Sequence, residues 1–249
     1  MIDRFKITEH AMVTRMRQME VISNNLANIN TTGFKRDELF MNELDKKIKE
    51  AQFSKFESKT HIPVSGTSVD LTQGSLVGTG QPLDIAISGA GFFTVESPAG
   101  EALTRDGRFT ISQDGVLVNI DGYPVLGDGG RIEIDLQKNT PSQIVVNNRG
   151  EILVDGAVVG RLQIVTTDAP QDLIKIGSNL LKLADGAGTL NPPENVSVRQ
   201  GFLEQSNVKP VREMVLMMEV FHFYETGQRM IRDQDRLLRL AVNDIGRVS

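Results

Sequence analysis

Residues 211–248 read VREMVLMMEVFHFYETGQRMIRDQDRLLRLAVNDIGRV, a stretch without proline that only Gly227 and Gly246 interrupt. Large side chains recur in it at intervals of seven residues: Met217, Tyr224, Ile231, Leu238 and Ile245. A second row interleaves with the first at the alternating three-and-four spacing of a coiled-coil seam, and its members are Met214, Phe221, Gln228, Asp235 and Val242. The opposite face mixes acidic and basic residues. We therefore predict one long amphipathic helix whose apolar edge has nothing in its own segment to cover it.

The first thirty residues carry a matching apolar stripe. It has one row at seven-residue intervals and a second row at the alternate positions: Phe5, Met12, Met19 and Leu26, then Met16, Ile22 and Ile29. We expect this helix to end near Asn28, because Asn28, Asn30 and Gly33 tolerate a left-handed backbone. Matching stripes at opposite ends of one chain predict that the termini pair with each other around an inserted domain.

The inserted region changes its pattern along the chain. Residues 34–80 are polar, with many Gly, Ser and Thr after Pro63, which predicts an extended connector with a possible short helix over 37–56. From Leu83 onward apolar residues alternate with polar ones. Asp-Gly dipeptides favour tight hairpin turns, and they occur at Asp106-Gly107, Asp114-Gly115, Asp121-Gly122 and Asp155-Gly156. The region therefore predicts a run of short antiparallel strands.

The predicted fold class is α+β, in which N- and C-terminal helices form a coiled-coil-like pair and an antiparallel all-β domain is inserted between them. Strands are expected at residues 83–87, 92–95, 109–111, 116–118, 123–126, 131–135, 144–146, 152–154, 158–166 and 180–183. The predicted boundaries are 1–33 for the N-terminal helix of the inner domain, 34–80 for the connector, 81–195 for the β-rich outer domain, and 196–249 for the return segment and C-terminal helix.

Composition excludes several classes of protein. The chain has 249 residues, of which 39% are hydrophobic, so it can bury a core in one or two domains. A net charge of −5 argues against a nucleic-acid partner. There is no cysteine, and no apolar run is long enough to insert in a membrane. Asp3, Arg4, Lys6 and Glu9 interrupt the apolar core that a cleaved signal peptide requires.

The residues that could carry chemistry do not assemble into a site. The histidines, His10, His61 and His222, are scattered over the terminal helices and the connector, without the several convergent ligands that a catalytic or zinc site needs. Gly89-Ala90-Gly91 is followed by a strand pattern and not by a helix, which favours a strand-to-strand turn over a phosphate-binding loop. The acidic residues of the turns lack the dense spacing of calcium loops, and they are Asp106, Asp114, Asp121 and Asp128. We predict no catalytic residue, no cofactor and no metal.

Several motifs identify a family. Residues 23–35, SNNLANINTTGFK, closely resemble the N-terminal signature of bacterial flagellar basal-body rod and hook proteins. Further matches, in order along the chain, are QGSL at 73–76, PLDIAI at 82–87, GAGFF at 89–93, TRDGRF at 104–109 and GFLEQSNV at 201–208. The resemblance spans nearly the whole chain. It implies that the signature residues are Asn24, Asn25, Leu26, Ala27, Asn28, Thr31, Gly33, Phe34 and Lys35.

The resemblance also implies a function. In this family the terminal helices form an inner coiled-coil tube, the β domain faces outward, and the flagellar type III apparatus exports subunits without a cleaved signal. The modest length is similar to that of rod proteins, and we expect a torque-transmitting subunit of the proximal rod, with the distal rod as the alternative. Its partners would be copies of itself and other rod proteins in the periplasmic part of the basal body.

On this reading both apolar stripes form the assembly interface. The C-terminal helix departs from the family at the aligned run 221–225, FHFYE, which keeps only the family's Tyr-Glu pair at Tyr224 and Glu225. An isolated pair of such helices is marginally stable, so we hypothesise that the termini become ordered on assembly. The alternative from another class is a secreted β-domain adhesin or binding module on a coiled-coil stalk, and an enzyme is a distant third.

Overall fold

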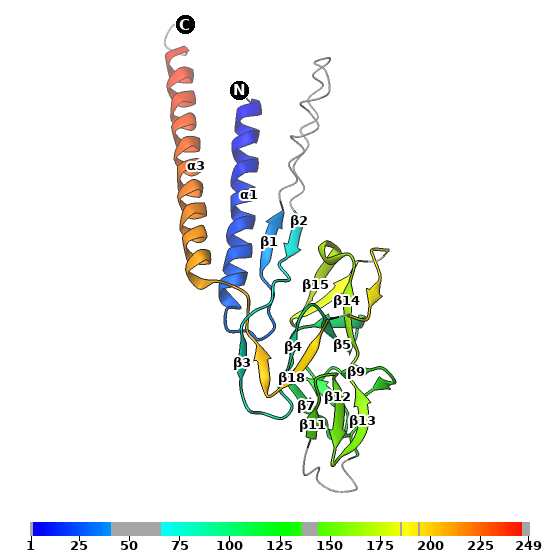
Figure 1. Ribbon diagram of the computed structural model, residues 1–249. Coiled ribbons are helices and arrows are strands. Elements are labelled where there is room, and N and C mark those ends of the chain that lie inside the picture. The colour runs from blue at the N-terminus through cyan, green and yellow to red at the C-terminus, as the bar shows by residue number, and fades with distance from the viewer. Residues whose placement is uncertain (1, 41–65, 136–143, 185, 194, 246–249) are drawn as a thin grey trace. The chain divides into compact units, whose positions relative to one another are not determined.

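The computed structural model describes residues 2–40, 66–135, 144–184, 186–193 and 195–245 (Figure 1). The chain divides into two compact units. One contains the terminal helices and is called the helical unit here. The other consists of residues 28–36 and 68–208 and is called the β unit. The coarse α+β prediction, with a helix at each end and antiparallel sheets between them, is confirmed.

The helical unit contains α1 (Ile2–Ala27) and α3 (Pro210–Ile245), which lie side by side and run in opposite directions (Figure 1). Helix α1 ends where expected, and the Asn28 carbonyl then accepts a hydrogen bond from the Thr31 amide at 3.2 Å. Helix α3 begins at Pro210, whose fixed φ and missing N–H suit the first helical position. Glu213 in the first turn complements the positive end of the helix dipole.

A six-stranded antiparallel sheet forms the centre of the β unit, in the order β15-β16-β6-β5-β14-β17. Its strands are β5 (Phe92–Ser97), β6 (Gly100–Thr104), β14 (Ile164–Thr167), β15 (Leu173–Gly177), β16 (Leu180–Leu183) and β17 (Leu190–Asn191). A three-stranded sheet is made of β11 (Ile144–Val146), β12 (Glu151–Val154) and β13 (Ala157–Arg161). A short 3-10 helix, η1 (Pro170–Asp172), precedes β15.

The remaining strands form two-stranded antiparallel pairs. In the β unit these are β4 (Ile85–Ser88) with β18 (Ser197–Gln200), β3 (Leu76–Gly78) with β19 (Phe202–Glu204), β7 (Phe109–Ile111) with β8 (Leu117–Asn119), and β9 (Leu126–Gly127) with β10 (Gly130–Arg131). A further pair joins β1 (Asp37–Phe40) and β2 (Gly66–Val69). The short helix expected over 37–56 is therefore not present at Asp37–Phe40, and the rest of that prediction lies outside the described residues.

Two apolar clusters hold the β unit together. The larger one centres on Phe93, whose ring meets that of Phe109 edge to face at a centroid distance of 5.0 Å. The smaller one gathers Phe92, Leu103 and Leu181 on the other side of the six-stranded sheet. Adjacent residues such as Phe92 and Phe93 point to opposite faces of a strand, so β5 supplies both clusters.

The Asp-Gly turns were predicted correctly at three of four places. Gly115, Gly122 and Gly156 have φ of 79°, 85° and 84°, and Asp155 has φ of 50°. The turn predicted at Asp106-Gly107 is wrong. The backbone of Gly107 instead passes so close to β4 that an added Cβ would lie 1.6 Å from the Ile85 carbonyl oxygen. The residue is glycine because two backbones approach closely there, and not because of a hairpin.

Candidate assembly surface and its buried charge cluster

Helix α3 turns positions 213, 220 and 227 toward α1, beside the row of Met217, Tyr224 and Ile231. The row expected there contained Met214 and Phe221. Glu213 and Val220 are buried, and the described residues Met217, Tyr224 and Ile231 are half-buried. Gly227 faces α1, since an added Cβ would lie 3.3 Å from Met12 Cγ. Positions 213, 220 and 227 therefore interleave with 217, 224 and 231. The absence of a side chain at Gly227 makes room for Met12 of α1.

Two members of the expected alternate row, Met214 and Phe221, are exposed, whereas Gln228 is half-buried. Met214 and Phe221 are 50% and 51% exposed. They belong to an apolar stripe over the first three turns of α3, in which exposed fractions run from 44% to 75%: Val211, Met214, Val215, Met218 and Phe221. These residues recur at intervals of three and four, so they share one face of the helix. Contiguous apolar surface of this kind makes the stripe a candidate interaction site.

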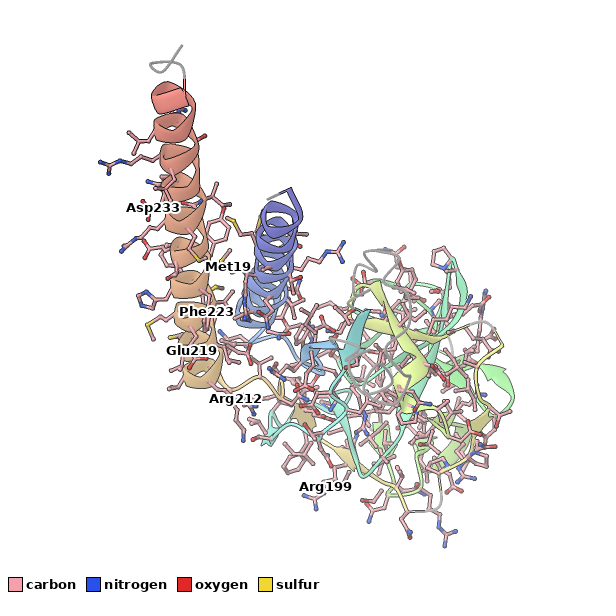
Figure 2. The ribbon with its side chains drawn as sticks, turned by 90° about the horizontal axis from the view of Figure 1, so that it is seen from above. Met19, Arg199, Arg212, Glu219, Phe223 and Asp233 are labelled. Carbon is pink, nitrogen blue, oxygen red and sulfur yellow. The ribbon has the colours of Figure 1, made fainter. Side chains whose placement is uncertain are left out.

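Helix α1 shows the same division. Ile22 is buried, and Met12, Met19 and Leu26 are half-buried. Figure 2 shows Met19 on the side of α1 that faces α3. Val13 and Met16 are exposed, and the Arg15 guanidinium lies 4.7 Å from the ring centroid of Phe223 on α3.

A shallow groove runs along the two helices, and its lining residues are Met19, Glu20, Ser23, Asn24, Ala27 and Met217. The predicted interface residues Phe5, Leu238, Val242 and Ile245 lie in α1 and α3, and their side chains are outside the described set. Ile29 is half-buried and belongs to the β unit.

A cluster of buried charges lies in the β unit. The carboxylate of Glu204, on β19, has 0% of its side chain exposed. Its Oε1 lies 2.5 Å from Lys35 Nζ, and its Oε2 lies 3.1 Å from Arg105 Nη1. The carboxylate accepts a third hydrogen bond, from the Gly74 amide to Oε1 at 2.9 Å. The carboxylate is therefore paired on both oxygens, as a charge without access to water must be.

The two cations of this cluster have further partners. Lys35 Nζ also donates to the Thr72 carbonyl at 2.8 Å, and Arg105 Nη2 donates to the Gly89 carbonyl at 2.7 Å. The turn Gly89-Ala90-Gly91, which joins β4 to β5, thus presents its backbone to a buried arginine. Burial lowers the pKa of Lys35 and of Arg105, and the attraction of Glu204 offsets part of each shift.

The residues before Lys35 are embedded in the same unit. The Gly33 amide donates to the Glu204 carbonyl at 2.7 Å, and Gly33 has φ of 67°. The ring of Phe34 is buried beneath the Lys175 ammonium, which lies 3.9 Å from its centroid. Asn179 Nδ2 donates to the Thr32 carbonyl at 2.7 Å. Residues 32–35 therefore pack as an integral part of the β unit, although the sequence placed 34 and 35 in a connector.

Two asparagines fix the chain on either side of this segment. Asn207 Oδ1 accepts from the Arg36 amide at 2.7 Å, and its Nδ2 donates to the Asp70 carbonyl at 2.8 Å. In the helical unit, the side chain of Asn25 is fully buried and pairs with both backbone groups of Asp37, each at 2.9 Å. A side-chain amide that satisfies one donor and one acceptor in this way substitutes for a strand partner.

Three family models match the chain. "Flagella basal body rod protein" matches residues 6–35, "Flagellar hook protein FlgE/F/G D1 domain" matches 86–154, and "Flagellar basal body rod FlgEFG protein C-terminal" matches 199–244. The chain is 37% identical over 240 residues to the flagellar basal-body rod protein FlgF of Caulobacter vibrioides, covering 95% of each chain.

Two further relatives agree with this match. Identity to FlgF of Mesorhizobium japonicum is 29% over 247 residues, or 99% of each chain. Identity to the flagellar basal-body rod protein FlgG of Agrobacterium fabrum is 30% over 262 residues, covering 96% of this chain and 98% of that one.

The chain belongs to the flagellar basal-body rod protein family. The predicted resemblance is confirmed. The three residues of the buried charge cluster are distributed over the three matched regions. Lys35 lies in the first of them, Arg105 in the second and Glu204 in the third. The features by which this family is recognised thus meet at one carboxylate.

Sequence reasoning missed this cluster. Lys35, Arg105 and Glu204 each stand in a quoted motif, yet Arg105 and Glu204 were not predicted as site residues, because charged residues are usually exposed. A signal was available: three motifs far apart in sequence contain charged residues of complementary sign, Lys35, Arg105 and Glu204.

Other kinds of site are not supported in the described part of the chain. No helix among the described residues is long and apolar enough to cross a membrane. Within the same residues, no three His, Asp or Glu side chains converge as metal ligands. The side chain of His222 is 78% exposed on α3, and His61 lies outside the described residues.

Gly33→Ala tests how tightly the signature segment is docked. The new Cβ would lie 2.4 Å from the Asp106 amide nitrogen, in addition to the strain of a positive φ. Gly100→Ala is the matched control, because its φ is also positive, at 97°, while no atom lies within 4 Å of the added Cβ. The control should lose about 1–2 kcal/mol of unfolding free energy, and Gly33→Ala about 1–3 kcal/mol more. Urea titration followed by circular dichroism measures both, and equal losses would contradict the docking.

Proposed function

We propose that this chain is a structural, non-enzymatic subunit of the proximal flagellar rod, which assembles helically through its terminal helices and transmits torque. The observation that carries the proposal is the exposed apolar stripe of α3 in a member of the rod family. Burial of a methionine or phenylalanine side chain is worth about 1.5–3 kcal/mol. Covering this stripe with a neighbouring subunit therefore supplies a driving force for association.

The geometry of the helical unit suits such an assembly. The α1-facing positions of α3 follow the three-and-four spacing of a coiled-coil seam, so we propose that α1 and α3 form a coiled-coil-like pair in the inner part of the rod. Met214 and Phe221 point away from that pair and contact neighbouring subunits. The proposed association is head-to-tail, since contacts between two different surfaces of the subunit generate a filament and not a closed dimer.

The β domain, including residues 81–195, faces outward from the helices. The partners are copies of the chain and other rod proteins, and nucleic acid is not among them. Export by the flagellar type III apparatus brings the subunit to the periplasmic rod, where the helices complete their ordering on assembly. The family membership supports a location in the flagellar basal body.

We take FlgF as the proximal and FlgG as the distal rod subunit, and on that basis the alignments favour a proximal position. The match to FlgG of Agrobacterium fabrum spans 262 positions, more than the 249 residues of this chain, so that relative contains residues which this chain lacks. The match to FlgF of Caulobacter vibrioides spans 240 positions at higher identity. The chain thus resembles FlgF in length as well as in sequence.

Phe221→Asp tests the assembly surface. Phe221 is half-exposed and away from α1, so an aspartate there leaves the subunit folded but places a charge in the proposed contact between subunits. Motility in soft agar should be abolished, with the unfolding transition of the purified protein unchanged. Ile120→Asp is the matched control, since Ile120 is 60% exposed on the β unit, and it should remain motile. Normal motility of Phe221→Asp would contradict the proposed surface.

Deletion of the gene tests the position in the rod. Basal bodies purified from a deletion strain and viewed by electron microscopy should have a rod truncated near its base. A rod that lacks only its outer segment would assign the chain to the distal rod instead.

A further inference from the structure

The chain passes between the β unit and the helical unit at four places: after Ala27, Arg36, Thr67 and Val208. Three of these crossings start from one patch of the β unit. The Asp70 amide donates to the Arg36 carbonyl at 2.8 Å, and Asn207 binds both the Arg36 amide and the Asp70 carbonyl. The residue before β1, the residue after β2 and the segment that leads into α3 are thus hydrogen-bonded to one another.

The charge cluster is close to this patch in sequence. Lys35 precedes Arg36, and Glu204 precedes Asn207 by three residues. The Gly33 amide adds a backbone hydrogen bond to Glu204. The segment that follows α1 and the segment that precedes α3 are therefore held together by the buried pair of Lys35 and Glu204, with Arg105 as the second cation.

The apolar pattern of the two helices admits more than one register. The α3 positions that face α1 include Gly227, which has no side chain, and the polar Glu213 and Gln228 are at or beside the contact. The apolar residues recur every seven positions in both helices. A slip of α1 along α3 by seven residues would match apolar to apolar again, and it would displace one helix by about 10.5 Å at 1.5 Å per residue.

We propose that Lys35, Arg105 and Glu204, together with Asn207, form an anchor that sets the register between α1 and α3. Helix α1 ends at Ala27, eight residues before Lys35, and α3 begins at Pro210, six residues after Glu204. Docking reaches Thr32 and Asn207, so residues 28–31 and 208–209 are all that links the docked segments to the helices. Connections this short oppose the displacement of a slip while both ends stay docked.

The ionic character of the anchor supplies its specificity. Glu204 is satisfied when Lys35 and Arg105 occupy their places, and any shifted docking of residues 32–35 leaves a buried carboxylate short of a partner. An apolar contact would tolerate such a shift, because apolar packing has little directional preference. The use of a buried polar group to select one register is well attested in coiled coils. The anchored residues act on the helices through the chain, so they are positioning residues.

Anchoring is a property of the β unit alone, whereas the effect on register rests on the helix pairing in the proposed function. The experiment therefore has two arms. The first is hydrogen exchange of the full-length chain, read at peptides that contain Gly33 and at peptides from β5. Glu204→Gln and Lys35→Met should raise exchange at Gly33 at least tenfold and leave β5 protected. Lys35→Arg should restore protection, and Glu96→Gln, which removes the exposed ion pair with Arg131, should change neither.

The second arm uses the absence of cysteine from the chain. The pair Met12→Cys and Gly227→Cys reports the observed register, and the pair Met19→Cys and Gly227→Cys reports a slip of seven residues. In cells making the otherwise unaltered chain, the intramolecular disulfide of the first pair should exceed that of the second at least tenfold. In the Glu204→Gln and Lys35→Met backgrounds the two yields should approach each other, and Lys35→Arg should restore the difference.

Each outcome decides between the two claims. A first-pair preference that persists in Glu204→Gln and Lys35→Met would overturn the anchor and leave the helix pairing intact. If neither pair cross-links in the unaltered background, the helix pairing fails and the register inference falls with it. Loss of β5 protection in both variants would show that the cluster is simply part of the core, which would also overturn the inference.

Discussion

A carboxylate with no access to water organises this molecule. Glu204 is fully buried and is paired with Lys35 on one oxygen and Arg105 on the other. Removing one partner of a buried pair is costly, on the order of 3–5 kcal/mol, because the remaining charge is left uncompensated. The three residues come from the beginning, the middle and the end of the chain, one from each region matched by a family model. The cluster therefore makes the β unit depend on both of its flanking segments.

This arrangement separates two tasks. The β unit has apolar clusters of its own around Phe93 and Phe92, so its fold does not draw on the terminal helices. Among the described residues, α3 turns two interleaved rows of positions toward α1 and leaves Met214, Met218 and Phe221 exposed. A structural subunit benefits from this division, because its chain ends remain available for association while their starting points are fixed.

Regular patterns in the sequence were sufficient to predict the elements that depend on local geometry. The periods of the terminal stripes predicted α1 and α3, and Asp155-Gly156 predicted the hairpin between β12 and β13. Strands β3, β18 and β19 were not predicted. Each is short and pairs with a strand more than a hundred residues away in sequence. Gly107 was misread for the same reason, because the residue is required by the close approach of the Ile85 backbone, 22 residues earlier in sequence.

The row of α3 that faces α1 shows a further limit of periodicity. Met214 and Phe221 fit a seam as well as Glu213, Val220 and Gly227 do by spacing alone. In the structure the second set faces α1, and Gly227 in that set accommodates Met12. A glycine and a glutamate are poor candidates for a seam when hydrophobicity is the criterion. The spacing thus predicted the helix and its apolar edge. Packing against α1 determined which apolar residues of α3 stay exposed.

The central claim is that the exposed stripe of α3 exists to be covered by neighbouring subunits. Hydrogen exchange at residues 211–221, compared between dilute free protein and assembled rods, tests it most directly. The account predicts rapid exchange in the free protein and exchange slowed at least tenfold in rods, with protection of β5 the same in both. Equal exchange at residues 211–221 in the two states would contradict it.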